Sequence, residues 1–284
     1  MDGRQGVAPL GGAPPDGKPP QPAIRTAELT RRFGDLVAVN AVSIEVRARE
    51  IFGLLGPNGA GKSTMIKMLT TLLPPTQGRA WVAGFDVTRE SGRVRRNIGY
   101  VPQALSADGA LSGYENLLVS ARLYHVPLAE RIGRIRQALE LVGLAEAAGQ
   151  LVRQYSGGMI RRLEIAQAML HRPAVLFMDE PTVGLDPVAR QAVWEHVRRL
   201  RGVFGMTLLI TTHYMEEAED LCDRVAMMHQ GRIAALGAPR ELKAQLGDVA
   251  TLDDVLIHVA GATIETGGRY REVLRTRRTA RHLS

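Results

Sequence analysis

Hydrophobic positions near the start of the chain alternate with polar ones, a pattern that predicts strands. Residues 23–34 (AIRTAELTRRFG) and 37–50 (VAVNAVSIEVRARE) are typical of strands in a hairpin-like sheet with its turn near positions 34–35. The apolar run IFGLLG that follows ends in glycine and predicts a short buried strand. Positions 62–73 then have helical spacing, and the two prolines after them predict where that helix stops.

The rest of the chain alternates strands with helices, apart from one long helical stretch. Positions 113–170 have helical spacing, interrupted near Pro127, Gly143 and Gly149. We interpret them as a helical subdomain, about residues 104–172, inserted into an α/β body. The other predicted elements are strands at 80–82, 98–101, 175–178, 207–211, 224–228 and 232–236, and helices at 90–96, 187–201, 216–221 and 239–247. Such alternation favours a mainly parallel sheet covered on both faces.

One predicted helix, within YSGGMIRRLEIAQAML at 155–170, begins with residues that disfavour a helix start. Met159, Leu163, Ala166 and Leu170 share one helical face. Two glycines, preceded by a serine, stand before them, although glycine weakens a helix. A bare N-terminus lets backbone N–H groups and the helix dipole approach an anion closely. This helix start is therefore a candidate anion site.

Both ends of the chain differ in composition from its middle. Residues 1–22 contain six prolines and five glycines, so we expect a disordered leader before an ordered domain at 23–247. Residues 248–284 are expected to form an accessory basic tail, which from Gly268 onward carries six arginines against one glutamate. Since the whole chain has a net charge of +7, this tail holds most of the basic excess. We interpret the arginines as a solvated face rather than a membrane-binding segment.

The cysteine content and the hydropathy bear on the compartment. The single cysteine, Cys222, cannot form an internal disulfide, which fits a reducing environment. No apolar run reaches the length of a membrane span, and the N-terminus lacks the apolar centre of a signal peptide. We therefore expect a soluble, cytosolic chain that needs a partner or surface attachment to act at a membrane.

The segment GPNGAGKST matches the phosphate-binding pattern G-x-x-x-x-G-K-[ST] between a predicted strand and a predicted helix. Its glycines let successive N–H groups face a phosphate, and the helix adds the positive end of its dipole. Lys62 would supply a full charge to the β- and γ-phosphates, Ser63 would ligate Mg²⁺, and Thr64 would reach another phosphate oxygen. The predicted nucleotide-binding residues of this loop are Gly56, Pro57, Asn58, Gly59, Ala60, Gly61, Lys62, Ser63 and Thr64.

A pair of acidic residues follows a second apolar run, in VLFMDEP. Asp179 stands at the carboxyl end of the predicted strand, where open α/β sheets bind their ligands, and is predicted to hold Mg²⁺ through water. Glu180 faces the γ-phosphate side and is the candidate base that orients or activates the attacking water. Together with the phosphate loop, this pair predicts a nucleotide-hydrolysing site.

From about residue 24 to residue 246, these motifs and their order resemble the nucleotide-binding subunits of ABC transporters. The resemblance identifies GPNGAGKST as the Walker A loop, VLFMDEP as Walker B and YSGGM as the signature loop. The residues whose roles it implies are Phe33 (stacking on adenine), Gln103 in YVPQ (contact with Mg²⁺ and water), Ser156, Gly157 and Gly158 (phosphate of the ATP held by a second subunit), Asp186 in GLDP (D-loop) and His213 in TTH (contact with the γ-phosphate).

The resemblance implies a fold and an assembly as well as a site. The fold is α/β: a P-loop ABC-ATPase core, with a mainly parallel sheet, an antiparallel β subdomain and an inserted helical subdomain. Two subunits would face each other head to tail, with one ATP between the Walker A loop of one and the signature loop of the other. The commoner signature is LSGGQ, so Tyr155 and Met159 depart from it, and Met159 removes one polar contact.

Three segments, YSGGM, LSGYENL and TLDDVLIHVAG, resemble the drug-export branch of the family, the daunorubicin-resistance-type ATPase subunits. That resemblance implies an ATP- and Mg²⁺-dependent hydrolase that energises export of a drug-like or hydrophobic compound. It implies a separate polytopic membrane subunit, a second copy of this chain and a peripheral place on the cytoplasmic side of the membrane.

The sequence also leaves other protein classes and simpler roles for single residues open. A soluble ABC ATPase acting on ribosomes or nucleic acid is the alternative, but such proteins usually carry two cassettes or a long coiled-coil insertion. A P-loop kinase or GTPase would lack the SGG helix start, and we expect no nucleic-acid partner. Among single residues, Phe33 could pack in a core, and Asp186 could cap the helix after it as well as serve the site.

Overall fold

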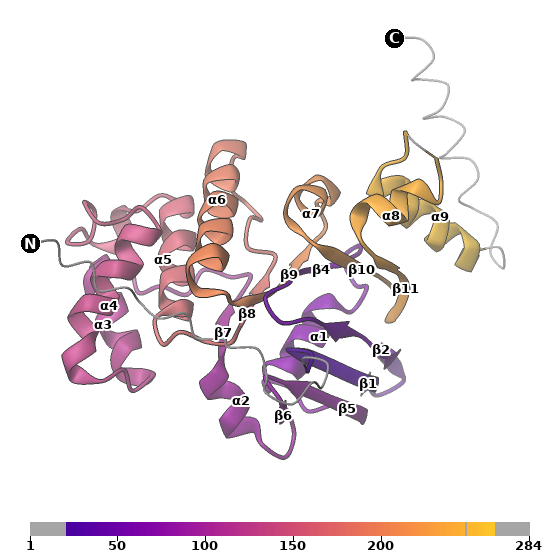
Figure 1. Cartoon of the computed structure of the whole chain (residues 1–284), viewed down its shortest axis with the longest axis horizontal. Helices are drawn as coiled ribbons and strands as arrows, with labels where there is room; N and C mark the ends of the chain where they lie inside the picture. Colours follow the sequence, from indigo (N-terminus) through magenta and orange to yellow (C-terminus); the bar gives the residue numbers. More distant parts are fainter. Residues whose placement is uncertain (1–20, 248, 265–284) are drawn as a thin grey trace, which may run out of the picture.

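The computed structural model describes residues 21–247 and 249–264, with strands in two sheets and helices around them (Figure 1). The strands are β1 (Ile24–Phe33), β2 (Leu36–Val42), β3 (Glu45–Val46), β4 (Ile51–Leu55), β5 (Gln77–Val82), β6 (Phe85–Asp86), β7 (Ile98–Val101), β8 (Val175–Asp179), β9 (Thr207–Thr212), β10 (Arg224–His229) and β11 (Arg232–Gly237). The helices are α1 (Lys62–Leu69), α2 (Ser91–Asn97), α3 (Gly113–Leu123), α4 (Leu128–Leu141), the 3₁₀ turn η1 (Val152–Gln154), α5 (Gly157–Met169), α6 (Pro187–Phe204), α7 (Met215–Leu221), α8 (Pro239–Ala244) and α9 (Leu252–Ile264). Most of the predicted leader and the arginine-rich end of the predicted tail lie outside the described residues.

The larger sheet has the strand order β11-β10-β4-β9-β8-β7 and runs through the middle of the molecule. Neighbouring strands from β10 to β7 are parallel, while β11 pairs antiparallel with β10. Figure 1 shows α6 and α7 on one side of this sheet and α1 on the other. The prediction of a mainly parallel sheet covered on both faces is therefore confirmed.

Strand β4 shows why the larger sheet needs both layers. Phe52 and Leu54 pack into a core shared with α1 and the antiparallel strands, whereas Ile51 packs into a core shared with α5 and α6. Successive residues of a strand point to opposite faces, so a strand whose residues are all buried requires cover on each side. All residues of β4 and of β8 are buried, as their continuous apolar runs predict.

The smaller sheet is antiparallel and has the order β2-β1-β5-β6, with β3 also pairing with β1. Its first hairpin turns at Gly34, whose φ of 56° lies in the left-handed region that glycine adopts readily. This sheet packs against α1, on the side of the larger sheet opposite α6 and α7 (Figure 1). The predicted hairpin and its turn are confirmed.

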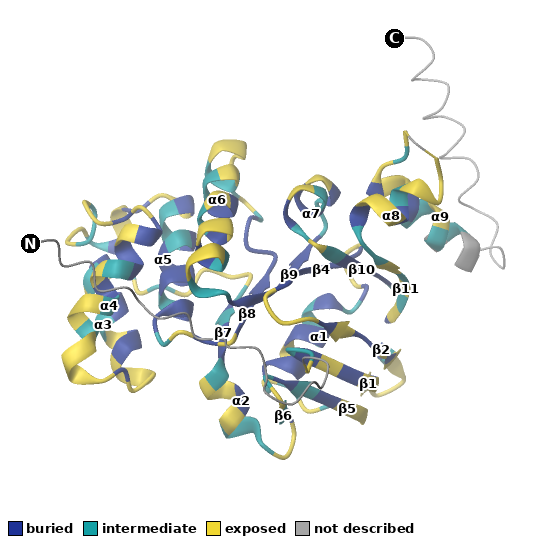
Figure 2. Ribbon diagram, in the orientation of Figure 1, coloured by how far each residue is buried: buried dark blue, intermediate teal, exposed yellow. Residues whose placement is uncertain are grey.

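Helices α3, α4 and α5 lie between β7 and β8 in the sequence and pack around one apolar cluster. Figure 2 shows buried inner faces and exposed outer faces on these helices. Leu163 and Ala166 of α5 and Leu170 at its C-cap contribute to this cluster, at the spacing that places them on one helical face. The predicted interruptions near Pro127 and Gly143 fall in the connections around α4.

Helix α1 is shorter than predicted. It ends at Leu69 rather than continuing to the two prolines, because Thr71 has a left-handed backbone with a φ of 65°. The hydroxyl of Thr70 donates a hydrogen bond to the Ile66 carbonyl at 2.9 Å and so satisfies a carbonyl of the last turn.

The predicted accessory tail contains a helix, α9, that packs on the domain. Leu252 and Val255 are buried in a cluster with side chains from α7 and α8. The Leu252 N–H donates to Oε1 of Glu219 at 3.0 Å, and Lys243 pairs with the same carboxylate at 2.6 Å. Within residues 21–247 and 249–264, no helix has the length and hydropathy needed to cross a membrane.

Candidate nucleotide-hydrolysing site

The loop between β4 and α1 can keep its shape only with glycine at two positions. Gly56 has a φ of 150°, and a Cβ atom there would lie 2.2 Å from the Met228 carbonyl oxygen. Gly61 has a φ of 106°, and its Cβ atom would lie 2.3 Å from the Ala38 carbonyl oxygen. Both approaches are closer than any side chain allows, so the loop is pressed against β2 and β10 as a tight cradle before the helix N-terminus.

A cavity of about 420 Å³ lies over this loop and collects most of the predicted site residues. Its lining is Phe33, Leu36, Ala38, Asn58, Gly59, Ala60, Gly61, Lys62, Ser63, Thr64, Gln103 and Glu180. The side chain of Lys62 folds back over the loop, where Nζ donates to the carbonyl oxygens of Gly56 at 2.9 Å and Pro57 at 3.2 Å. An ammonium group thus lies over a glycine-rich loop that leads into a helix N-terminus, the arrangement that binds nucleotide phosphates.

Asp179, at the end of β8, directs its carboxylate to the first turn of α1. Its Oδ1 atom accepts a hydrogen bond from Ser63 Oγ at 3.2 Å and another from Thr211 Oγ1 at 2.6 Å. The Asp179 side chain is buried, and parallel pairing of β8 with β9 brings Thr211 beside it. A hydroxyl and a carboxylate oxygen this close fit a magnesium site that is completed by water and phosphate oxygens, which is the donor set this ion prefers.

Glu180 is the residue on which the other predicted catalytic side chains converge. Its Oε1 atom lies 3.1 Å from Lys62 Nζ, and its Oε2 atom lies 3.3 Å from Nδ1 of His213. The side-chain amide of Gln103 donates to the same Oε2 atom at 3.4 Å. Residues far apart in the sequence are therefore brought to one carboxylate at the mouth of the phosphate loop.

The backbone of Glu180 is strained. Its φ of 46° is left-handed, a conformation that a non-glycine residue adopts at a cost of about 1–3 kcal/mol. The N–H group of Glu180 donates to both the carbonyl oxygen and the hydroxyl of Thr211, at 3.1 and 2.9 Å, which holds this conformation. In this conformation the Glu180 carboxylate lies beside Lys62.

Phe33 lies at the edge of the cavity and remains 45% exposed, so it is not a core residue. The guanidinium of Arg31 lies over its ring, 4.6 Å from the ring centroid, and donates to the Pro74 carbonyl at 2.8 Å. An arginine fixed in this way supports the ring and leaves apolar surface on the cavity for stacking with a base.

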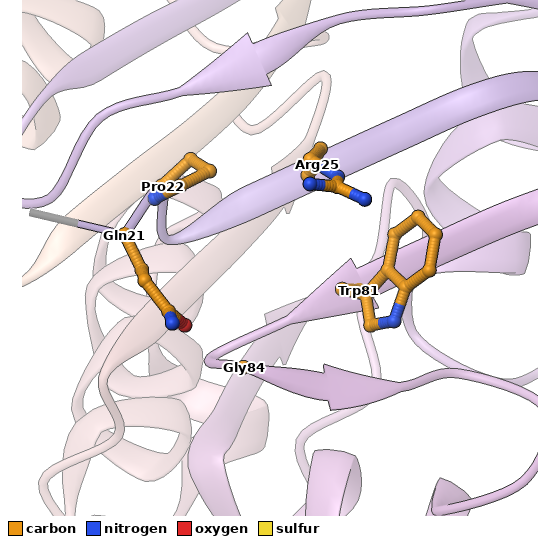
Figure 3. A pocket seen from close by; sticks show the side chains of 5 residues that line it. All are labelled: Gln21, Pro22, Arg25, Trp81 and Gly84. Carbon is orange, nitrogen blue, oxygen red and sulfur yellow. The ribbon is translucent and has the colours of Figure 1, made fainter. Parts of the chain in front are cut away.

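A second cavity, of about 350 Å³, lies at the other end of the antiparallel sheet and is lined by Gln21, Pro22, Arg25, Trp81 and Gly84 (Figure 3). In it the Arg25 guanidinium lies 4.4 Å from the Trp81 ring centroid. None of the lining residues that the structure describes here was predicted as a site residue. The cavity over the phosphate loop is therefore the candidate nucleotide site.

The signature residues lie elsewhere in the chain's own fold. Ser156 is the N-cap of α5, and its hydroxyl accepts a hydrogen bond from the Met159 N–H at 3.3 Å. Ser156 and Gly157 are exposed, while Gly158 packs so closely on α6 that a Cβ atom there would lie 2.9 Å from Ala189 Cβ. Among the described residues that line the 420 Å³ cavity, none belongs to positions 156–158.

The structure gives a physical reason for Tyr155 in the signature loop. Its hydroxyl donates to the Ala147 carbonyl at 2.6 Å, and its ring packs among apolar side chains of α3, α4 and α5. A Cβ atom on Gly113 would lie 2.3 Å from that hydroxyl, so the two positions are matched. Burial raises the pKa of the Tyr155 hydroxyl.

The half-buried Met159 packs against the same cluster, which accounts for an apolar residue there.

Asp186 caps α6, as the sequence predicts for an aspartate before proline. Its Oδ1 atom accepts hydrogen bonds from the N–H groups of Val188 at 3.0 Å and Ala189 at 2.9 Å. The cap fixes the loop between β8 and α6, and Gly158 of α5 packs beside it on Ala189. Asp186 does not line the cavity over the phosphate loop.

The sequence did not single out Glu217, which joins the two loops that flank the site. Its buried carboxylate accepts hydrogen bonds from Thr182 Oγ1 at 2.9 and 3.0 Å and from Thr212 Oγ1 at 3.1 Å, and lies 3.3 Å from Arg190 Nε. Arg190 in turn lies over the ring of Tyr214, next to His213. Thr212, at the end of the apolar run TLLITT, was the available signal, because a buried hydroxyl there needs a partner.

The site combines a P-loop, an acidic pair at the end of a buried strand, and Lys62, which joins the loop to that pair. This combination defines a nucleotide hydrolase of the P-loop class. The family model described as "ABC transporter" matches residues 39–183. The chain belongs to the ABC transporter family, as an ATP-binding and ATP-hydrolysing subunit.

Curated relatives and solved structures agree with this assignment. The chain is 44% identical over 239 residues to daunorubicin resistance ATP-binding protein DrrA3 of Streptomyces coeruleorubidus, covering 84% of this chain and 75% of that protein. It is 40% identical over 224 residues to linearmycin resistance ATP-binding protein LnrL of Bacillus subtilis, covering 79% of this chain and 72% of the relative. A solved ATP-binding subunit of an ABC transporter superposes with a TM-score of 0.75 at 28% identity, covering 84% of this chain and 99% of the other. The predicted ABC-ATPase fold is thereby confirmed.

Proposed function

We propose that this chain hydrolyses Mg-ATP at the Glu180 cluster and energises export of a drug-like or hydrophobic compound through a separate membrane subunit. The observation that supports it most is the convergence of Lys62, Gln103 and His213 on the Glu180 carboxylate. The names of the relatives support the substrate class, since they are daunorubicin, doxorubicin and linearmycin resistance proteins.

In the proposed reaction, Lys62 and the N–H groups of the loop hold the β- and γ-phosphates of ATP. A γ-phosphate beside Lys62 competes with Glu180 for the ammonium group, and this frees the carboxylate to accept a proton from water. Water then attacks the γ-phosphorus in line, the bond to the β-phosphate oxygen breaks, and ADP and phosphate leave. His213 and Gln103, both within reach of Glu180, stabilise charge and orient the water.

We assign the magnesium position to Ser63 and Asp179, with Gln103 at its edge. Ser63 Oγ would bind the ion directly, and the Asp179 carboxylate would bind through water. Bound there, Mg²⁺ would neutralise charge on the phosphates as the bond breaks. Thr211 keeps the Asp179 carboxylate in place through the hydrogen bond described above.

We propose that each ATP is completed by a second copy of the chain. The exposed residues Ser156 and Gly157 lie outside the chain's own cavity, at the N-terminus of α5. The N–H groups of that helix start, with the Ser156 hydroxyl, suit the γ-phosphate of an ATP held by the facing copy. Asp186 would contribute to the same interface, and Phe33 would stack on the adenine.

We propose that the assembly lies on the cytoplasmic side of the membrane. Within the chain, we propose an ATPase domain at residues 23–247, in which α3, α4 and α5 (about residues 104–172) form a helical subdomain. The permease would span the bilayer and choose the compound. Nucleic acid is not among the partners we propose.

Binding, turnover and transport measurements test this proposal. The chain should co-purify with a polytopic membrane protein when the two are expressed together, and ATP turnover should require Mg²⁺. Cells that carry both proteins should accumulate less of an anthracycline than cells whose chain carries Glu180→Gln. Equal accumulation in the two strains would contradict drug export. Salt-sensitive binding of nucleic acid by the domain without its arginine-rich tail would favour the soluble class instead.

A further inference from the structure

Helix α5 contains an ion pair buried among apolar side chains. Arg161 Nη1 lies 2.9 Å from Glu164 Oε2, and each side chain is only 2% exposed. The residues next to them, Leu163, Ile165 and Ala166, are buried and apolar. Taking a charged pair out of water is costly, and apolar residues of similar size are often as stable in its place. The pair therefore calls for a reason beyond filling space.

Both charged groups reach one segment, residues 102–106, just after β7. Arg161 donates from Nη1 to the Pro102 carbonyl and from Nη2 to the Gln103 carbonyl, each at 2.6 Å. Glu164 Oε1 accepts hydrogen bonds from the backbone N–H of Ser106 and from its hydroxyl, the latter at 3.1 Å. The segment has no helix or strand of its own and is exposed from Gln103 to Ser106.

We propose that Arg161 and Glu164 are positioning residues that fix segment 102–106 to α5, so that Gln103 and the signature residues move as one unit. The side chain of Gln103 contacts Glu180 in the chain's own site, at 3.4 Å. The start of α5, at Ser156, serves the ATP of the facing copy. The buried pair thus links the two ATP sites that one chain helps to form; this inference rests on the proposed function.

The next residue of the helix provides a matched control. Arg162 also donates to backbone carbonyls, those of Val142 at 2.8 Å and Gly143 at 3.3 Å, which follow α4. It has the same residue type, lies on the same helix and makes the same kind of contact, but it holds the end of α4 rather than segment 102–106. A variant at Arg162 therefore reports the cost of losing such a contact without releasing Gln103.

The test uses a double variant that carries both Arg161→Met and Glu164→Leu. It is compared with the single variant Arg162→Met, and both are made in the full chain. Removing both charges avoids an unpaired buried ion, and water can reach the freed groups of the exposed segment. We expect the double variant to lower kcat about tenfold to a hundredfold, the loss that follows when a catalytic group is misplaced by about 1 Å, with a KM for ATP close to the unmodified value. Arg162→Met should keep kcat. Glu164→Gln alone, which keeps an acceptor for Ser106 and for Arg161, should keep most of the rate that the double variant loses.

Hydrogen exchange resolved to single amides gives a readout that does not depend on any variant. In the unmodified chain, the Ser106 amide should exchange as slowly as amides within α5, although it lies in an exposed loop. Fast exchange there, or an unchanged kcat in a folded double variant, would overturn the proposal. If the double variant does not fold, the exchange rate of the Ser106 amide in the unmodified chain is sufficient to test the proposal. An unmodified chain that protects this amide but hydrolyses no ATP would contradict the proposed function and leave the linkage standing.

Discussion

The Nζ atom of Lys62 lies 3.1 Å from Oε1 of Glu180, and their side chains are 4% and 7% exposed. The pair joins the cation of the phosphate loop to the carboxylate that we propose activates water. A phosphate in the cradle competes for the same ammonium group, so binding and release of the carboxylate are coupled by charge. Substitution of each residue should therefore have a different effect: loss of Glu180 should lower kcat, and loss of Lys62 should weaken ATP binding as well.

Glu180→Gln should lower kcat about 10²- to 10⁴-fold, the range for removing a general base, because the amide cannot take the proton of the attacking water. The KM for ATP should stay within a few-fold, since Lys62 and the loop still hold the phosphates. Steady-state hydrolysis and equilibrium nucleotide binding measure the two effects. Lys62→Ala is the contrasting variant, expected to lose binding as well; steady turnover in Glu180→Gln would refute the base assignment.

Asp179→Asn should raise the Mg²⁺ concentration for half-maximal hydrolysis about 10- to 100-fold, the usual effect of losing a group that binds a metal through water. The amide keeps the size of the side chain but loses the negative charge. Titration of ATP hydrolysis with MgCl₂ gives the shift. Thr211→Ser, which keeps the hydroxyl that contacts Asp179, serves as the control and should titrate like the unmodified chain.

Gly158→Ala and Gly157→Ala should separate folding from function in the signature loop. A Cβ atom at 158 would lie 2.9 Å from Ala189 Cβ, and such overpacking costs about 1–3 kcal/mol of unfolding free energy. At 157 the nearest side-chain atom is 3.5 Å away, so the fold should be spared while the approach of a phosphate is hindered. Denaturant unfolding measures the first effect. Adding Ala189→Gly should rescue Gly158→Ala; no rescue would show that this contact is not the cause.

Phe33→Ala should raise the KM for ATP about tenfold, because a base stacked on an aromatic ring contributes about 1–3 kcal/mol. The value of kcat should change little, since Phe33 makes no contact with the Glu180 cluster. Phe33→Tyr retains the ring over which Arg31 lies and should behave like the unmodified chain. An unchanged KM in Phe33→Ala would exclude stacking as a source of affinity.

His171 should make the protein less stable as the pH falls below about 6.5, the ordinary pKa of histidine. Burial, and then the positive charge of Arg134, lower its pKa, while a hydrogen bond to the Ile98 carbonyl opposes them. The unfolded chain therefore takes up a proton before the folded one, so stability is full above the unfolded pKa and is lost as the pH falls through the folded pKa.

Unfolding free energy measured between pH 7.5 and pH 5 tests this dependence. His171→Phe keeps a ring to stack on Tyr124, whose ring centroid lies 3.9 Å away, and should reduce the slope. Burial also lowers the pKa of His196, so part of the slope should remain in that variant. An unchanged slope would assign the whole effect to other groups.

The order of elements and the phosphate loop could be predicted because their signals are local. GPNGAGKST needs its glycines and lysine at fixed spacing, and the apolar run of β8 needs burial on both faces, so both features are visible in a few residues. The end of α1 could not be predicted from the prolines, because the left-handed backbone of Thr71 stops the helix earlier. Helix α9 was not predicted, although Leu252, Val255, Leu256 and Val259 have helical spacing and form the face that packs in the cluster with α7 and α8.

The sequence by itself determined the chemistry that is available: which side chains can hold a phosphate, a magnesium ion and a proton, and in which order they occur. Tertiary structure alone decided that Lys62, Gln103 and His213 meet at Glu180, and that the buried pair of α5 holds the segment before it. The physical reason is that parallel strands align residues distant in sequence at one edge of a sheet, where contacts depend on packing rather than on local spacing. The SGG helix start was odd in the sequence, and in the fold it is a capped, exposed helix end whose second glycine packs directly on α6.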